Sequence, residues 1–112
     1  MGGVFHVVQF KFNSGLSEQR LKEICDRVLA LRQQCIHPTT RQPYIKVIYG
    51  GKENPIEGMQ DGHTHTFIVE FDSVADRDYY AVKDPAHREC VQYLGTVVAQ
   101  IHIVDFVDGV YE

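Results

Sequence analysis

The stretch Val-Phe-His-Val-Val-Gln-Phe-Lys-Phe at residues 4–12 predicts a strand with large apolar side chains on both of its faces. One face carries His6, Val8, Phe10 and Phe12, and the other carries Phe5, Val7, Gln9 and Lys11. Helices that follow such a strand cover one face of its sheet, so the second face needs a different cover. A second sheet is the economical solution, and we therefore expect a homodimer in which two sheets close on one another.

The rest of the chain alternates between helical and extended patterns. A helix is predicted from Ser17 to about Gln34, with an apolar stripe formed by Leu21, Ile24, Val28, Leu31 and Cys35. Strands are predicted over 44–49, 63–71 and 101–107. Between the last two, one helix runs from Ser73 to about Val82 and another from Asp84-Pro85 to about Ala99.

The resulting order, β-α-β-β-α-β, predicts one α+β domain over residues 1–112. This order is typical of the ferredoxin-like fold, a four-stranded antiparallel sheet with helices on one face. The polar segment from residue 52 to residue 62 contains Pro and Gly, which predicts a loop that could serve as a flap over a site.

Composition and charge argue against several kinds of partner. The formal net charge is −4 and no run of basic residues occurs, so nucleic acid and an anionic membrane are not expected partners. No apolar stretch reaches the roughly 18 residues of a membrane span, and no signal segment precedes the first strand, so we expect a cytoplasmic protein. Cys25, Cys35 and Cys90 are odd in number and widely spaced, which indicates reduced thiols and no disulfide framework.

Five short motifs occur in order across nearly the whole chain. They are the strand opening at 6–12, Gly62-His63-Thr64-His65, Glu70-Phe71-Asp72-Ser73, Tyr80 upstream of Pro85-Ala86-His87, and Asp105-Phe106. Together they resemble the stress-responsive A/B barrel (Dabb) family of the dimeric α/β-barrel superfamily. That family includes a plant olivetolic acid cyclase type, which closes a linear polyketide by aldol condensation without a metal or an organic cofactor. The resemblance implies a ferredoxin-like chain that pairs into a dimeric α/β barrel and needs no cofactor.

The resemblance also implies a reacting group made of His6, His87 and an upstream tyrosine. The cyclase pattern has three residues between that tyrosine and Pro-Ala-His, whereas four residues separate Tyr80 from Pro85. Tyr80, Tyr79 or neither could therefore donate a hydrogen bond to a developing enolate oxygen. Because adjacent helical residues lie about 100° apart, only one of the two tyrosines can face a cavity.

His87 has the position expected of a general base. It is the third residue of the last predicted helix, where the positive end of the helix dipole disfavours the imidazolium and keeps the ring neutral at pH 7. Asp105 shares an apolar strand face with Ile101 and Ile103, so its carboxylate needs a partner. Asp105 either fixes the tautomer of His87 or His6, or receives backbone and hydroxyl donors at the sheet edge.

The rest of the pocket is expected to be mainly apolar. The residues predicted to contact substrate are Val8, Phe10, Ile24, Cys25, Val28, His65, Phe67 and Ile103. The cyclase type places aromatic residues at the positions of Ile24, Cys25 and Val28. We therefore expect this pocket to have a different shape and to take a different substrate.

A metal site is the weaker interpretation of the histidines near residue 64. His63 and His65 lie two residues apart on one predicted strand face, a spacing that could present two imidazoles to a metal ion. His6 or His102 could supply a third ligand. Polar residues at the end of a strand explain the pair equally simply, and no metal is expected.

These expectations lead to one leading function and two alternatives. The leading hypothesis is a small cofactor-independent cyclase or lyase that acts on an apolar, carbonyl-rich, polyketide-like secondary metabolite. In this hypothesis His87 abstracts an α-proton, a tyrosine stabilises the enolate oxygen, and His6 orients or reprotonates the intermediate. The alternatives are a non-catalytic stress-response protein whose dimeric barrel is itself the functional unit, and a monooxygenase of the same fold that acts on a quinol-like substrate or haem.

Overall fold

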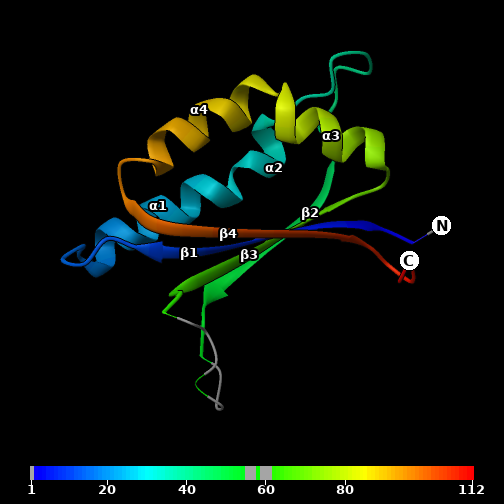
Figure 1. The fold of residues 1–112 in the computed structure, drawn as a ribbon. Helices are drawn as coiled ribbons and strands as arrows, with labels where there is room; N and C mark the ends of the chain where they lie inside the picture. Colours follow the sequence, from blue (N-terminus) through cyan, green and yellow to red (C-terminus); the bar gives the residue numbers. More distant parts are fainter. Residues whose placement is uncertain (1, 55–57, 59–61) are drawn as a thin grey trace.

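The helices and strands follow one another in the predicted order. The computed structural model describes residues 2–54, 58 and 62–112. Its elements are β1 (Val4–Phe12), α1 (Glu18–Leu29), α2 (Leu31–Gln34), β2 (Ile45–Lys52), β3 (His65–Phe71), α3 (Val74–Val82), α4 (Pro85–Leu94) and β4 (Val98–Val107). The strands form one antiparallel sheet in the order β2-β3-β1-β4, with the helices on one of its faces (Figure 1). The predicted α+β, ferredoxin-like fold is confirmed.

The register of β1 brings polar and apolar residues from three strands together. His6 lies opposite Asp105 of β4, and Val8 lies between Phe67 of β3 and Ile103 of β4. Side chains at directly opposite positions of antiparallel strands share one face and have their Cβ atoms about 4.5–5.5 Å apart. An imidazole, a carboxylate and a group of apolar side chains therefore share one region of the helix-facing side of the sheet.

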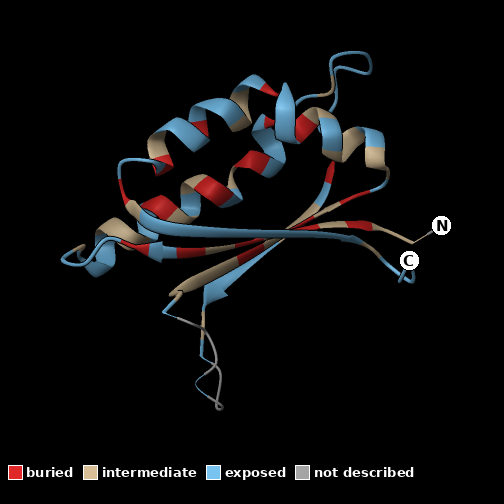
Figure 2. Ribbon diagram, in the orientation of Figure 1, coloured by how far each residue is buried: buried red, intermediate tan, exposed pale blue. Residues whose placement is uncertain are grey.

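The hydrophobic core lies between the helices and the sheet face that carries His6 (Figure 2). Alternate residues of β1 are buried on this face, as the sequence pattern predicts. The strand residues buried there are Val4, His6, Val8, Phe10 and Phe12 of β1, Ile45 of β2, and Phe67, Val69 and Phe71 of β3. They pack against a stripe of buried residues on the helices, which includes Ile24 and Val28 of α1.

The helices of the described chain leave the opposite face of the sheet uncovered. Phe5 and Phe106 stack on this face with their ring centroids 5.0 Å apart, and Phe106 remains 48% exposed. On the same face, the side-chain amide of Gln9 donates a hydrogen bond to the carboxylate of Glu53 at 3.2 Å, and the Thr66 hydroxyl donates one to the same oxygen at 2.7 Å. We call this surface the outer face; it is the apolar surface that the sequence predicts to need a second cover.

The first predicted helix is divided in two. α1 ends at Leu29, and Ala30 turns the chain while its own N–H bonds to the carbonyl oxygen of Asp26 at 2.9 Å. α2 then starts at Leu31, which is buried in the core. The expected single helix to Gln34 is therefore wrong in detail, since it is divided at Ala30, while Leu31 keeps its predicted place on the buried stripe.

The last helix is shorter than predicted and the last strand is longer. α4 ends at Leu94, because Gly95 forms its C-cap and the chain then turns back towards the sheet. Val97 is buried within that turn, and Val98 already pairs with Phe12 of β1. The predicted helix end near Ala99 is therefore wrong, and β4 begins before the predicted start at residue 101.

β2 continues through two glycines that the sequence predicts to end it. Gly50 lies opposite Phe67 of β3, and a side chain at this position would overlap the Phe67 ring. Gly50 therefore provides the space into which an aromatic ring packs, while Gly51 has open space around it. The strand ends at Lys52.

Most of the predicted loop from residue 52 to residue 62 lies outside the described residues, which omit 55–57 and 59–61. The flap prediction therefore has no structural counterpart here. Within the described ranges, none of the helices has both the length and the apolar composition of a membrane span.

Candidate functional site

An apolar cavity of about 180 Å³ lies between the helices and the sheet. Its polar ring or hydroxyl groups come from three residues, His6, Tyr80 and His87, and its lining includes no Lys, Arg, Asp or Glu. The lining residues are His6, Val8, Phe10, Val28, Leu31, Phe67, Val69, Tyr80, Ala81, His87, Cys90, Val91, Leu94, Ile101 and Ile103. A mainly apolar pocket with a few convergent polar groups is the usual form of a small-molecule site.

His6 is held by a carboxylate on the neighbouring strand. Its Nδ1 lies 2.7 Å from Oδ1 of Asp105, and the histidine is 6% exposed. Because an ionised carboxylate can only accept hydrogen bonds, Nδ1 of His6 carries a proton and donates a hydrogen bond to Asp105. In the neutral ring, Nε2 is then the nitrogen that can take a proton from a ligand. Of the two histidines that the sequence leaves open as partners of Asp105, the carboxylate contacts His6.

The second carboxylate oxygen of Asp105 is held from the helix layer. Nη1 of Arg77, on α3, donates to Oδ2 of Asp105 at 2.9 Å, while Nε of the same guanidinium donates to Asp78 at 2.8 Å. Sequence reasoning missed Arg77, since nothing in the local pattern shows which of the charged residues at 76–78 turns towards the sheet. Asp105 itself is not among the cavity-lining residues and reaches the cavity through His6.

Tyr80 lies between the two histidines. Its ring meets that of His6 edge to face at a centroid distance of 5.7 Å, and it stacks on that of His87 at 3.9 Å. Burial, which is the largest cause, raises the pKa of Tyr80 well above its ordinary value of 10.0. The hydroxyl therefore stays protonated and able to donate a hydrogen bond. The structure thus brings together His6, Tyr80 and His87 of the predicted reacting group.

A buried N-cap fixes the position of His87. Oδ1 of Asp84 accepts from the backbone N–H groups of Ala86 at 2.9 Å and His87 at 3.3 Å, at the start of α4. The Tyr44 hydroxyl donates to the other oxygen of Asp84 at 2.5 Å. Both oxygens of a carboxylate that is only 1% exposed are therefore engaged. The cap was predicted from Asp84-Pro85, whereas Tyr44 was not, because no sequence signal links residues so far apart.

The ring of His87 is in its neutral form at pH 7. Burial lowers its pKa from the ordinary value of 6.5, and the neighbouring His6 lowers it further, while the backbone of Tyr80 and the carboxylate of Asp84 oppose the shift. The sequence attributes this neutrality to the helix dipole, but burial is the largest cause. Nδ1 of His87 is buried and has no hydrogen-bond partner among the described residues. A buried nitrogen without a partner is costly, so a hydrogen bond to a ligand would be favourable there.

Two predicted helix-one contacts do not line the cavity. Ile24 is fully buried in the core and Cys25 is half-buried beside it, but neither belongs to the cavity wall. From this part of the chain, Val28 and Leu31 line the cavity instead. The cavity lies against the end of α1, so residues one turn earlier pack into the core.

Tyr79 and His65 also lie away from the cavity. The Tyr79 ring lies 5.7 Å from that of Tyr44, on the other side of α3 from Tyr80. His65 begins β3, where its Nδ1 lies 2.9 Å from the Thr64 hydroxyl and its ring packs edge to face on Phe12 at 4.9 Å. Neither residue is part of the cavity wall.

The two histidines of the metal hypothesis do not converge. The His63 ring lies 5.9 Å from that of His102, whereas the ring of His65 lies against Phe12 on the helix-facing side. His102 in turn bonds to Gln9 at 3.1 Å on the outer face. Within the described part of the chain, no group of three or more His, Cys, Asp or Glu residues could hold a metal ion.

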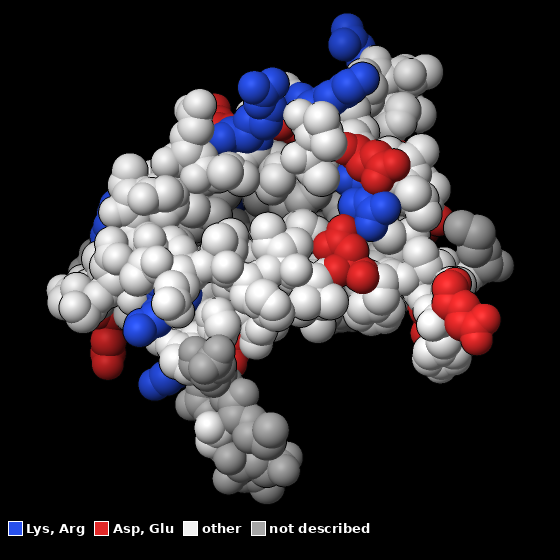
Figure 3. Space-filling model, viewed as in Figure 1, with Lys and Arg blue, Asp and Glu red and all other residues white. Residues whose placement is uncertain are grey.

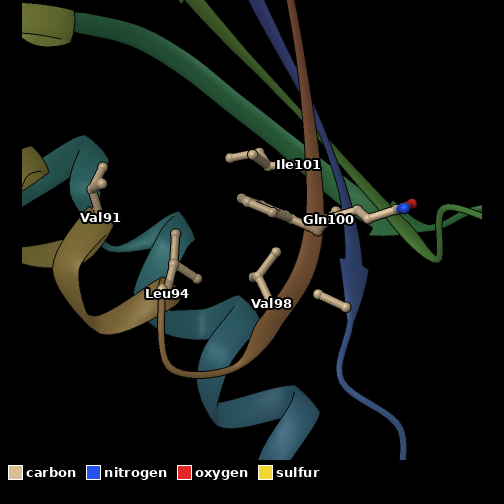
Figure 4. Close-up of a pocket in the computed structure, with 8 residues that line it drawn as sticks. Val91, Leu94, Val98, Gln100 and Ile101 are labelled. Atoms are coloured by element: carbon tan, nitrogen blue, oxygen red, sulfur yellow. The ribbon is translucent and has the colours of Figure 1, made fainter.

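A second hollow of about 230 Å³ continues from the cavity along the seam between α4 and β4 (Figure 4). The two spaces share Phe10, Val91, Leu94 and Ile101 as walls. Figure 4 shows Ile101 turned towards α4, while Gln100 points to the other side of the strand. The surface over this seam is mainly uncharged (Figure 3). Apolar walls therefore lead from the histidines towards the end of α4. Sequence reasoning did not assign Val91 and Leu94 to the site.

The comparisons with known proteins agree with this architecture. A family model described as the stress responsive A/B barrel domain, Dabb, matches residues 4–108. A search of curated proteins found no match.

Several solved structures share the fold. The Arabidopsis thaliana protein At3g17210 is 26% identical with a TM-score of 0.79, covering 97% of this chain and 98% of that one. A hydroxynitrile lyase from Passiflora edulis is 21% identical with a TM-score of 0.82, covering 99% and 98%. SnoaB from Streptomyces nogalater, described as a cofactor-independent oxygenase, is 14% identical with a TM-score of 0.67, covering 99% and 97%. Further bacterial neighbours are described as dimeric ferredoxin-like proteins of unknown function.

Proposed function

The chain belongs to the stress-responsive A/B barrel (Dabb) family, and from this premise we propose that it is a small enzyme in which cavity histidines transfer protons to and from an apolar carbonyl compound. One observation carries the proposal. His6 and His87 line the same apolar cavity on either side of Tyr80, and the first of these histidines is backed by Asp105. A base, a hydrogen-bond donor and an oriented second imidazole are the groups that carbanion chemistry at a carbonyl requires.

The proposed steps follow from the state of each group. His87, neutral and with an unpartnered Nδ1, removes a proton from the carbon next to the carbonyl group. Tyr80, whose hydroxyl stays protonated, donates a hydrogen bond to the oxygen that becomes negative. His6, fixed through its Nδ1, orients the intermediate or exchanges a proton with it. Protein side chains alone supply these groups, as in a cofactor-independent cyclase or lyase.

The lining of the cavity supports an uncharged, mainly apolar substrate. No charged side chain of the lining could offset a carboxylate or a phosphate. A cavity of about 150 Å³ can bind benzene, so the space of about 180 Å³ beside the histidines suits a single ring or a short chain. A longer polyketide-like molecule would extend into the hollow along α4 and β4.

A homodimer is part of the same proposal. The outer face exposes the stacked pair Phe5 and Phe106, and solved neighbours of this fold are described as dimeric. Two copies that bring these faces together would cover the apolar surface that helices leave open. The non-catalytic alternative shares this dimer, so the dimer alone does not distinguish the two functions.

The proposal can be tested with acetophenone, a single-ring ketone that fits the volume of the cavity. Hydrogen-deuterium exchange at its methyl group, followed by NMR in D₂O, reports proton removal directly. The protein should accelerate this exchange, and His87→Gln should reduce the acceleration by a factor of about 10² to 10⁴, the usual contribution of a general base. His37→Gln is the matched control, because His37 lies outside the cavity and accepts backbone N–H bonds from Thr39 and Thr40.

Equal exchange in the wild type and His87→Gln would contradict the assignment of the base. No acceleration and no binding of acetophenone by the wild type, with a stable dimer, would favour the non-catalytic stress protein. Oxygen uptake with 1,4-dihydroxynaphthalene as a quinol probe would favour the monooxygenase.

A further inference from the structure

Arg77 joins the helix layer to the Asp105–His6 pair. Its guanidinium donates through Nη1 to Oδ2 of Asp105 at 2.9 Å, and Oδ1 of the same carboxylate lies 2.7 Å from Nδ1 of His6. Arg77 comes from α3, Asp105 from β4 and His6 from β1, so three elements meet in this chain of contacts. Arg77 itself is not among the residues that line the cavity.

The geometry determines how the carboxylate of Asp105 can turn. One oxygen is bound to a planar guanidinium and the other to an imidazole, so rotation about the carboxylate bond would break a contact at both ends. The carboxylate cannot donate a proton, so Nδ1 of His6 must carry one. A fixed Asp105 therefore favours the tautomer of His6 that leaves Nε2 without a proton.

The positive charge of Arg77 also favours the form of His6 in which Nε2 carries no proton. A lone carboxylate next to a buried imidazole favours the doubly protonated ring, in which Nε2 also carries a proton. A guanidinium remains charged at all relevant pH values and offsets the charge of Asp105. The other groups that face His6 are Tyr80, whose ring meets its edge, and His87, which interacts with it electrostatically. Neither supplies a negative charge at neutral pH.

We propose that Arg77 is a positioning residue that acts through Asp105 to keep Nε2 of His6 free of a proton. The inference rests on the proposed function only in that it gives His6 a part in proton transfer. A purely structural role for Arg77 would be to fasten α3 to β4. The side chains of Arg77 and Asp105 are 22% and 26% exposed, so the pair is partly buried, and a structural role would appear as a loss of folding stability without a change in the protonation of His6.

The test is ¹⁵N NMR of the histidine side chains in the full chain at pH 7. Nε2 of His6 should give the signal of a nitrogen without a proton in the wild type. In Arg77→Gln it should move towards the signal of a protonated nitrogen, with a several-fold rise in the protonated share. Arg77→Met makes the same change with a side chain of different polarity, and it decides the question if the glutamine variant fails to fold. Arg77→Lys, which restores a cation, should return the signal part of the way.

Arg32→Gln is the matched control. It also removes a guanidinium that donates a hydrogen bond, here from Nε to the carbonyl oxygen of Lys46 at 3.2 Å, and it should leave the His6 signal unchanged. An unchanged Nε2 signal in folded Arg77→Gln or Arg77→Met would overturn the proposal. Acetophenone exchange provides the second measurement, with a loss of about tenfold expected in Arg77→Gln. Because the ¹⁵N signal needs no substrate, failure of the proposed function would leave the inference about Arg77 separately decidable.

Discussion

The rings of Tyr80 and His87 stack at a centroid distance of 3.9 Å, although the two residues belong to different helices. The break between α3 and α4 makes this contact possible. α3 ends at Val82 with Lys83 as its C-cap, and Asp84 caps α4, so the phenol near the end of α3 lies against the imidazole at the start of α4. A continuous helix would carry residues seven positions apart two turns from each other along its axis, about 10 Å, and could not stack their rings.

Tyr80→Phe should separate binding from chemistry. The phenylalanine keeps the ring that contacts His6 and His87 but lacks the hydroxyl that donates to the developing oxyanion. We expect the affinity for acetophenone to change little, and the rate of deuterium exchange to fall about 10² to 10³-fold, the usual cost of one oxyanion donor. Titration calorimetry and NMR exchange measure the two quantities. An unchanged rate would mean that the hydroxyl plays no part in proton transfer.

The free energy of unfolding should decrease as the pH is lowered, and part of this decrease should depend on His87. The pKa of His87 is lowered below its ordinary value of 6.5 in the folded state, so the unfolded chain takes up a proton first as the pH falls through 6.5. The wild type should therefore lose stability relative to His87→Gln between pH 7.5 and pH 5.5. Urea unfolding of both proteins at a series of pH values measures the difference. A wild type that gained stability relative to the variant on acidification would contradict the assignment.

The lowered pKa of His87 also determines how the rate of acetophenone exchange should depend on pH. The imidazole of His87 acts as a base only when neutral, so exchange should be constant near pH 7 and should decline only below the ordinary pKa of histidine, at 6.5. Initial rates of acetophenone exchange across this range provide the check. A profile that rises with acidity would point to the imidazolium as the active form.

Gly50→Ala should shrink the cavity through Phe67. An added Cβ at residue 50 would overlap the Phe67 ring, which is buried and forms part of the cavity wall. The ring must shift, and we expect a loss of about 1–3 kcal/mol in the free energy of unfolding together with weaker binding of acetophenone. Gly51→Ala is the matched control, because the same methyl group on the next residue meets open space. Equal effects of the two substitutions would show that the change acts through the strand backbone.

Asp84→Ala should destabilise the fold more than loss of an ordinary cap. It removes the N-cap of α4 and leaves the buried Tyr44 hydroxyl without its acceptor, so we expect a cost of about 2–4 kcal/mol. Ser17→Ala removes an exposed cap, bonded to Arg20 at 3.1 Å, and should cost about 1 kcal/mol. Urea unfolding at pH 7 compares the two. The double variant Asp84→Ala with Tyr44→Phe should recover part of the loss, since the unsatisfied hydroxyl is then gone.

Phe106→Asp should separate the proposed dimer. A carboxylate at this position faces the apolar outer face and would be buried without a partner between two sheets. Sedimentation velocity should show a monomer for the variant and a dimer for the wild type. Val82→Asp, an exposed position on α3 in the helix layer, is the control and should remain dimeric. A monomeric wild type would contradict the proposed assembly.

The fold was predictable because its signals are local. The alternation in residues 4–12 and the caps at Ser17, Ser73 and Asp84 each follow from a few neighbouring residues, and the order of elements follows from them. The predicted bounds of an element were wrong where a contact with a residue distant in sequence determines them. Gly50 continues a strand because Phe67 packs over it.

The candidate site was predictable in part, for the same reason. The face shared by His6 and Asp105 follows from strand alternation in each strand, but their pairing needs the register of β1 against β4. The choice between Tyr79 and Tyr80 depends on how α3 rotates against the sheet, which the sequence spacing leaves open. Arg77 could not be found at all, because its role depends on its contact with Asp105, which joins α3 to β4.

β4 is an edge strand of the sheet and also forms part of the cavity wall. Ile101 and Ile103, which contribute that wall, are 55% and 52% exposed, whereas Phe67 on β3, which also lines the cavity, is almost entirely buried. A change of size at either isoleucine would therefore alter the shape of the pocket with little disturbance of the interior packing. Evolution could thus adapt this half of the pocket to new ligands while the folding determinants on β1 and β3 stay fixed.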